Sequence, residues 1–330
     1  MKNIIALIAA LAISFLSAQS FAAEIKFAIV APEGSTWSKI VREWNEDLKV
    51  KTNGQVSFKI YAGGVQGDER DVIRKMKIGQ LDAAGFTGLG LGIINSEVRV
   101  LELPFLFQNY KEVDAVTKKL QPKLKAGFAK KGFEFLGWAE AGFVNIFSNK
   151  PIATLKDLKG VKMWMWEADP LVKALCDEFG IVPIPLALAD VLTSLQTNLI
   201  DAAYAPPLGA IALQWFTRTK FYTKDKLTNS TGAFLITKRA MNKLTLAQQK
   251  ILRETALKYS KKLINKTRAE NAQSYTALAN AGLKPVDIEA ASLEEIRTRS
   301  QKVWDKLSGQ LYSPELLLEV KQTVAATRGQ

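Results

Sequence analysis

Polar and apolar residues follow two periods along the first part of the chain. Residues 24–30 and 55–61 alternate polar and apolar side chains, a period of two that is typical of β-strands. Residues 35–49 carry apolar side chains at helical spacing, and residues 67–79 form a second predicted helix with an acidic start. Because strands and helices alternate, the pattern predicts an α/β fold with a largely parallel sheet.

Two passages in separate halves of the chain resemble each other. Residues 74–86 and 194–205 each run from a predicted helix, through Gly79 or Asn198, into a short strand that contains Asp-Ala-Ala. We interpret them as one βαβ unit that occurs twice in the chain. Two such units facing each other create a cleft at the carboxyl ends of their strands, where ligands bind in open sheets.

The region from residue 238 to residue 281 has little Gly or Pro and an apolar period of three to four, which predicts one long or kinked helix. Thr245 and Gln248 have the spacing of a capping box and predict a helical restart. We expect this helix to contact both domains and to brace the hinge. A short strand and two further helices follow, at residues 282–286, 293–307 and from 314.

A short apolar run, residues 161–165, places Trp164 and, just after it, Trp166 one residue apart in a predicted strand. Side chains two positions apart on a strand point to the same face, so both rings line either a core or a cavity. Met163 and Met165 take the opposite face and are the better core candidates.

Residues 1–22 predict a secretory signal peptide. Lys2 precedes an apolar run over residues 4–16 and a small-residue stretch that ends at Ala22, the best cleavage point. The run is too short to be a confident membrane span. We therefore expect a periplasmic protein, and the remaining length predicts two domains.

Composition excludes several function classes. The formal charge of +13 comes from lysines spread along the chain, and the densest cluster, residues 118–131, has the spacing of a solvated helix face, which argues against nucleic-acid binding. The sequence has no histidine and one cysteine, Cys176, so His-dependent nucleophiles, His-containing zinc sites and an internal disulfide are excluded. Cys176 lies in a helical pattern and is expected to be a small core hydrophobe.

A glycine-rich stretch at residues 85–92 follows a predicted strand and suggests a phosphate-binding turn. A dinucleotide site also needs an acidic residue about 20 positions further on, and only Glu102 lies in that region, in an unsuitable place. No P-loop, metal cluster or nucleophile with its base is visible. We therefore expect a binding protein without a cofactor, not an enzyme.

Four passages, in this order, carry a resemblance to a known family: GQLDAAGF, RVLELPFLF, SNKPIATLKDLKGVKM and LQTNLIDAA. With them the chain resembles the extracytoplasmic solute-binding proteins of tripartite ATP-independent periplasmic (TRAP) transporters over nearly its whole mature length. The resemblance implies a periplasmic-binding-protein-like fold, in which two α/β lobes close on a small solute and present it to membrane permease subunits. The lobes are expected at residues 23–143 with 232–270 and at residues 144–231 with 271–330.

The resemblance also implies an unusual site. Family members usually have an arginine at the position of Trp164, and its guanidinium holds the ligand carboxylate. A tryptophan offers one N–H donor and no charge. Other positions that match ligand contacts are mostly small or apolar, with aromatic residues nearby. The candidate site comprises Trp164, Trp166, Phe86, Thr87, Trp37, Tyr204, Glu167, Leu188, Val144 and Ala205.

Three solute classes fit such an aromatic cleft, and the first two rank about equally. An aromatic or apolar acid would stack on the rings and need another cation, whereas a cationic or zwitterionic solute would lie over the indole faces and need a counter-charge. A sugar or polyol fits less well because hydrogen-bonding groups are scarce. The candidate cations are Lys162, Arg70 and Arg99, and the candidate acids are Glu33, Glu140 and Glu167.

Two alternatives stay open. Glu167 precedes Asp169 and Pro170, which have the character of a helix start, so its charge serves equally well near the positive end of that helix. The same two-lobed fold also suits a sensory protein that presents its ligand to a membrane receptor instead of a permease.

Overall fold

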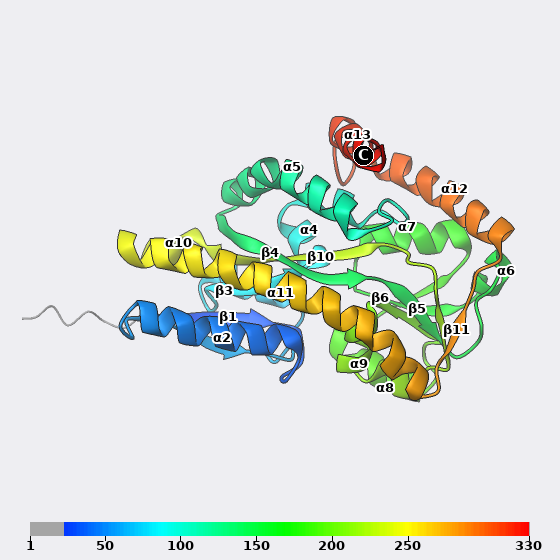
Figure 1. Cartoon of the computed structure of the whole chain (residues 1–330), viewed down its shortest axis with the longest axis horizontal. Helices are drawn as coiled ribbons and strands as arrows, with labels where there is room; N and C mark the ends of the chain where they lie inside the picture. The colour runs from blue at the N-terminus through cyan, green and yellow to red at the C-terminus, as the bar shows by residue number, and fades with distance from the viewer. Residues whose placement is uncertain (1–22, 330) are drawn as a thin grey trace, which may run out of the picture.

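The computed structural model describes residues 23–329, which form two lobes around two separate β-sheets (Figure 1). The predicted signal peptide, residues 1–22, lies outside the described residues. Within residues 23–329, none of the helices has both the length and the apolar character that crossing a bilayer requires.

The first sheet has the strand order β2-β1-β3-β10-β4. β1 is parallel to β2 and β3, and β10 is antiparallel to its neighbours β3 and β4. Aromatic rings fill one side of the sheet: Phe27 packs edge to face on Trp44 of the first helix, with ring centroids 5.8 Å apart. The strands are β1 (Ala23–Ile29), β2 (Val56–Tyr61), β3 (Ala83–Thr87), β10 (Asn229–Thr237) and β4 (Phe133–Phe143).

The second sheet has the order β11-β9-β5-β8-β6-β7. β6 is parallel to β7 and β8, whereas β5 is antiparallel to β8 and β9. Each sheet therefore contains one strand that runs against the others, and the expectation of largely parallel sheets is confirmed. The strands are β11 (Lys284–Val286), β9 (Phe221–Thr223), β5 (Asn145–Ser148), β8 (Ala202–Ala205), β6 (Lys162–Met165) and β7 (Val182–Pro185).

The two Asp-Ala-Ala passages have the same local geometry, one in each sheet. The Asp82 carboxylate accepts a hydrogen bond from the backbone N–H of Lys26 at 3.0 Å, and Asp201 accepts one from the N–H of Lys162 at the same distance. The turn before each strand contains a residue with positive φ, Gly79 at 87° and Asn198 at 57°. The predicted repeat therefore places β3 and β8 in equivalent positions of the two lobes.

Short helices connect the strands and cover both sheets. Their starts are set by side-chain caps: Ser35, Asp68 and Asp169 each accept a backbone N–H of the helix that follows. The first lobe contains α2 (Thr36–Lys51), α3 (Glu69–Ile78), α4 (Gly88–Ile94), η1 (Ser96–Glu102) and α5 (Tyr110–Lys130). The second contains α6 (Leu155–Leu158), α7 (Pro170–Phe179), η2 (Leu188–Asp190), α8 (Val191–Gln196), α9 (Pro207–Ala212) and η3 (Trp215–Thr217).

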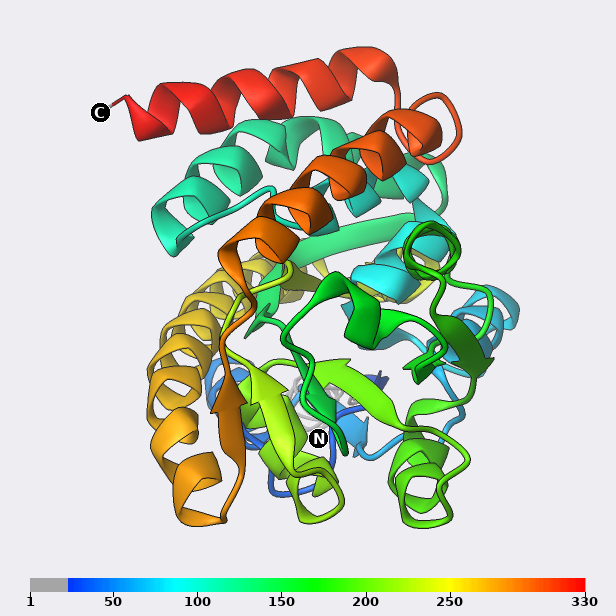
Figure 2. The ribbon, with the colours of Figure 1, turned by 90° about the vertical axis from the view of Figure 1, so that its right-hand side faces the viewer.

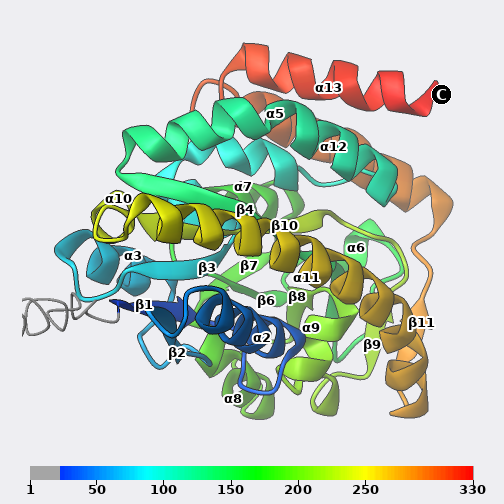
Figure 3. The same cartoon turned by 60° about the vertical axis from the view of Figure 1, so that its left-hand side comes forward.

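The long helix α11 (Leu246–Asn280) runs along both lobes (Figure 3). It packs on α2 and β4 of the first lobe and on α9 of the second. Thr245 and Gln248 form the predicted capping box. The preceding residues form a separate helix, α10 (Lys238–Met241), so the predicted kink is a full break before Thr245. The bracing role expected of this segment is confirmed.

The C-terminal helices cross back toward the first lobe. α12 (Ala290–Leu307) packs on α6 and α7, and α13 (Pro314–Arg328) lies along α5 (Figure 2). Trp304 and Leu316 belong to the same buried cluster as Phe86 of β3. The lobe boundaries stay a prediction, but α13 does not pack on the second sheet as the assignment of residues 271–330 implied.

Candidate functional site

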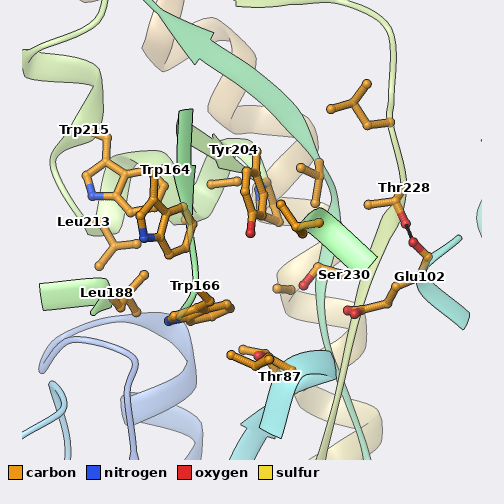
Figure 4. A pocket seen from close by; sticks show the side chains of 18 of the residues that line it. Thr87, Glu102, Trp164, Trp166, Leu188, Tyr204, Leu213, Trp215, Thr228 and Ser230 are labelled. Carbon is orange, nitrogen blue, oxygen red and sulfur yellow. Dashed lines mark hydrogen bonds between the residues drawn. The ribbon is translucent and has the colours of Figure 1, made fainter. Parts of the chain in front are cut away.

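A cavity of about 640 Å³ lies between the two lobes (Figure 4). Its walls include the β1–α2 turn and the end of β3 from the first lobe, and the ends of β6 and β8 with α7 and α9 from the second. The segments that cross between the lobes also contribute: Val144 and Leu227 line the cavity, and the Leu227 N–H donates to the Val144 carbonyl at 2.9 Å. The volume is within the range of small-molecule sites.

Four aromatic rings form one wall of this cavity. Trp164 is at the centre of the group: its ring stacks on Tyr204, with centroids 4.9 Å apart, and meets Trp166 and Trp215 edge to face at 5.1 and 5.2 Å. Its indole N–H donates to the Leu186 carbonyl at 3.1 Å. We call Trp164, Trp166, Tyr204 and Trp215 the aromatic wall.

The rings of the aromatic wall differ in burial: Trp164 and Trp215 are buried, whereas Trp166 and Tyr204 are partly exposed. Trp164 is 1% exposed, because other rings cover most of its surface. Trp166 is half-buried, and its indole N–H has no hydrogen-bond partner within residues 23–329. The Tyr204 hydroxyl also has no partner there, and it points toward the space bounded by Trp166, Thr87 and Ser230 (Figure 4). Both of these unpartnered polar atoms are buried next to the cavity.

The structure brings most of the predicted site residues together. The cavity is lined by Trp37, Thr87, Val144, Trp164, Trp166, Leu188, Tyr204 and Ala205. Their roles as ligand contacts stay a prediction. Trp215 was not predicted as a site residue: it reaches the aromatic wall from η3, and no local sequence pattern connects it to β6.

Two predicted residues do not line the cavity. Phe86 is 1% exposed in the core of the first lobe, because Gly85 and Thr87 face the cavity and alternate residues of a strand point to opposite sides. Glu167 is exposed in the turn after β6, where Ala168 has a φ of 57°. The site assignment was therefore wrong for the positions of Phe86 and Glu167.

A buried cluster of charges lies at one end of the cavity. Arg99 of η1 is 4% exposed, and its guanidinium contacts the Glu102 carboxylate at 2.7 Å and the Asp169 carboxylate at 2.9 Å. Asp169 also accepts the backbone N–H groups of Leu171 and Val172 as the N-cap of α7. Arg99, a candidate ligand cation, is thus already paired within the protein, and its contact with Asp169 joins the two lobes.

Burial and pairing act against each other in this cluster. Burial lowers the pKa of Arg99, but the negative charges of Asp169 and Glu102 outweigh it and leave the pKa raised. Burial raises the pKa of Glu102 despite the nearby guanidinium. The pKa of Tyr204 is raised well above its usual value, mainly by burial, so this hydroxyl stays protonated. Arg99 is thus already neutralised by the protein's own carboxylates.

Comparison with known proteins identifies the family. A family model for DctP, the bacterial extracellular solute-binding proteins of family 7, matches residues 27–310. The chain belongs to this family. Such proteins are the solute-binding receptors of TRAP transporters: they bind small organic solutes and are not enzymes.

Individual relatives agree with this assignment. The chain is 26% identical over 268 residues to the 2,3-diketo-L-gulonate-binding periplasmic protein YiaO of Escherichia coli K12, covering 79% of each chain. It is 28% identical to the uncharacterized protein YiiZ of Salmonella typhimurium over 65% of this chain and 66% of YiiZ. A TRAP periplasmic solute-binding protein of Ralstonia eutropha H16, solved with (S)-2-acetolactate, superposes with a TM-score of 0.87 at 25% identity, covering 92% of this chain and 99% of that one.

The other charges near the cavity of this DctP-family protein are mostly paired or distant. Glu33 lines the cavity but forms a two-point ion pair with Arg42, and Glu140 lies outside the lining and pairs with Arg268. Lys162 and Arg70 do not line it either, contrary to their candidacy as ligand cations. Lys39 does, at the exposed start of α2, and has no ion pair within residues 23–329.

Proposed function

We propose that this protein captures a largely apolar organic acid between its lobes in the periplasm and delivers it to the membrane permease of a TRAP transporter. The observation that carries the solute class is the aromatic wall, which stands where the resemblance expects a guanidinium. Stacking on Trp166 and Tyr204 favours a flat or aliphatic body over a small polar one.

The depth of the cavity favours an uncharged part of the solute. An unpaired charge moved into an apolar site costs several kcal/mol, so buried charges are paired in proteins. Arg99 is already paired with Asp169 and Glu102. A solute carboxylate brought to this cluster would be the third carboxylate and would meet a net negative charge. The carboxylate of the solute is therefore expected at the rim of the cavity, where the Lys39 side chain is exposed to solvent.

The same charges argue against a cationic solute. Of the three acids expected to balance a cation, Glu33 is held by Arg42, Glu140 is held by Arg268 and Glu167 lies outside the cavity. Relatives also point to acids: YiaO is named for 2,3-diketo-L-gulonate, and the Ralstonia protein was solved with (S)-2-acetolactate. An apolar acid agrees both with the paired or distant acidic residues of this protein and with the acids named for its relatives.

The proposal is tested by thermal melts and native mass spectrometry of the mature protein with a small panel of compounds. Octanoate and phenylacetate should raise the melting temperature and appear as one bound molecule, whereas malate and phenethylamine should not. Trp166→Ala should remove both effects. Trp138→Ala is the matched control, because Trp138 is also half-buried with an unpartnered indole N–H but does not line the cavity. Tight binding of malate or phenethylamine would refute the proposed class.

A further inference from the structure

The cavity does not end at the aromatic wall. Trp164 and Met163 point to opposite faces of β6, yet both line it, so the same cavity reaches both faces of the second sheet. The part behind the sheet lies between β5 and β6 on one side and α6, α7 and α12 on the other. We call it the rear branch, and its lining consists of Ile146, Leu158, Met163, Leu175, Cys176, Phe179, Ile181, Ile296 and Ser300.

The rear branch has the composition of a hydrophobic core, although its residues line the cavity. Ile146, Met163 and Ile296 are each no more than 5% exposed and belong to one buried cluster. Protein interiors are normally close-packed, and an unfilled apolar cavity destabilises the fold in proportion to its volume. Apolar cavities also stay free of water and take up hydrocarbon. Filling by an apolar group would therefore stabilise this lobe.

One polar atom marks the far side of the rear branch. Ser300 of α12 is 0% exposed, lines the cavity and has a hydroxyl without a hydrogen-bond partner within residues 23–329. Tyr204 packs against the buried clusters on both faces of the sheet and lines the cavity. A molecule that occupies the cleft and the rear branch together must bend around the end of β6, which a flexible chain can do and a rigid ring system cannot.

From this geometry we infer that the rear branch binds an unbranched aliphatic tail of the solute, and that its length sets the longest tail accepted. The inference rests on the proposed function, since it assigns the acid's tail to the rear branch and its carboxylate to the rim. Ser300, Ile296 and Cys176 would then be specificity-determining residues that lie outside the interlobe cleft itself.

The test measures binding of straight-chain acids, from butanoate to hexadecanoate, to the mature protein by calorimetry. Each added methylene should raise the affinity about fourfold until the rear branch is full. Ser300→Phe should end this rise at a shorter acid and weaken binding of the longer acids at least about tenfold, with butanoate unchanged. Thr298→Phe is the matched control, because Thr298 is an exposed small polar residue on the same helix and should leave the series unchanged.

Cys176 supplies a second readout that needs no variant. It is the only cysteine of the chain, is 1% exposed and lines the rear branch. Long acids should slow its modification by methyl methanethiosulfonate, and butanoate should not. The inference is overturned if affinity does not rise with chain length, if Ser300→Phe folds and matches the wild type, or if long acids fail to protect Cys176. Failure of every acid to bind would instead refute the proposed function.

Discussion

Replacing Trp164 of β6, or Trp166 just after this strand, separates support of the aromatic wall from contact with the solute. Trp164 is covered by three rings and bonded to the Leu186 carbonyl, whereas Trp166 is half-buried with its indole N–H unpartnered. We expect Trp164→Ala to damage the fold of the second lobe and Trp166→Ala to damage binding alone. A pure ligand contact at Trp164 would give the opposite order of stabilities.

The magnitudes follow from burial. Truncating a fully buried tryptophan costs about 3–5 kcal/mol, which includes roughly 0.5–1.5 kcal/mol for each lost aromatic pair. Trp164→Ala should therefore lower the free energy of unfolding by about 3–5 kcal/mol and the melting temperature by roughly 6–12 °C. Trp166→Ala loses one ring contact and little buried area, so about 1–2 kcal/mol is expected. Its octanoate affinity should fall roughly 30-fold, as for a central aromatic contact.

Urea unfolding followed by circular dichroism measures both stabilities, and calorimetry with octanoate measures binding. Trp138→Ala again controls for the loss of an indole elsewhere. The interpretation is wrong if Trp164→Ala unfolds within about 1 kcal/mol of the wild type, or if Trp166→Ala is the more destabilised protein. Either result would mean that the rings of the aromatic wall do not support one another as their contacts imply.

Three further predictions concern charges. Asp169→Asn keeps the N-cap of α7 but leaves Glu102 as the only carboxylate paired with Arg99. The free energy of unfolding should therefore fall by about 2–3 kcal/mol. Small-angle scattering should show a more open, larger particle. Lys39→Gln should weaken octanoate binding several-fold by calorimetry without changing the binding of octanol. The Glu69 carboxylate accepts the Thr87 N–H and hydroxyl, but burial, with the charge of Asp68, raises its pKa to about 7. The folded protein then binds this proton more tightly than the unfolded chain does. The free energy of unfolding should therefore rise by up to about 3 kcal/mol as the pH falls from about 8 to about 5. Urea titrations at each pH measure this rise, and Glu69→Gln should flatten it.

Local patterns predicted the elements and the repeat. The period-two alternation located β1 and β2 to within one or two residues, and the Asp-Ala-Ala passages identified β3 and β8, because the aspartate and the turn residue act within a few positions of the chain. The Thr245 capping box was also a local signal. The break before it, and the return of α13 to the first lobe, depend on packing between distant elements, which no local period records.

The candidate site was predicted in part for the same reason. Strand alternation placed Trp164 and Trp166 on one face, and the resemblance placed Thr87, Val144 and Leu188 around them. The burial of Arg99 was missed because its partner Asp169 is 70 residues away. The rear branch was missed because an apolar face, such as that of Met163, has the same sequence pattern whether it fills a core or surrounds a cavity.

The buried pair between Arg99 and Asp169 is compatible with closure of the cleft on the apolar solute that we propose. The resemblance implies that, in family members with arginine at the position of Trp164, the solute carboxylate supplies the charge that neutralises this guanidinium. Here η1 of the first lobe supplies the guanidinium and the N-cap of α7 in the second supplies the carboxylate, so the charged contact across the cleft is complete without a ligand. Closure then requires no anionic group deep in the cavity, which agrees with our proposal that the aromatic wall and the apolar surface behind it select the solute.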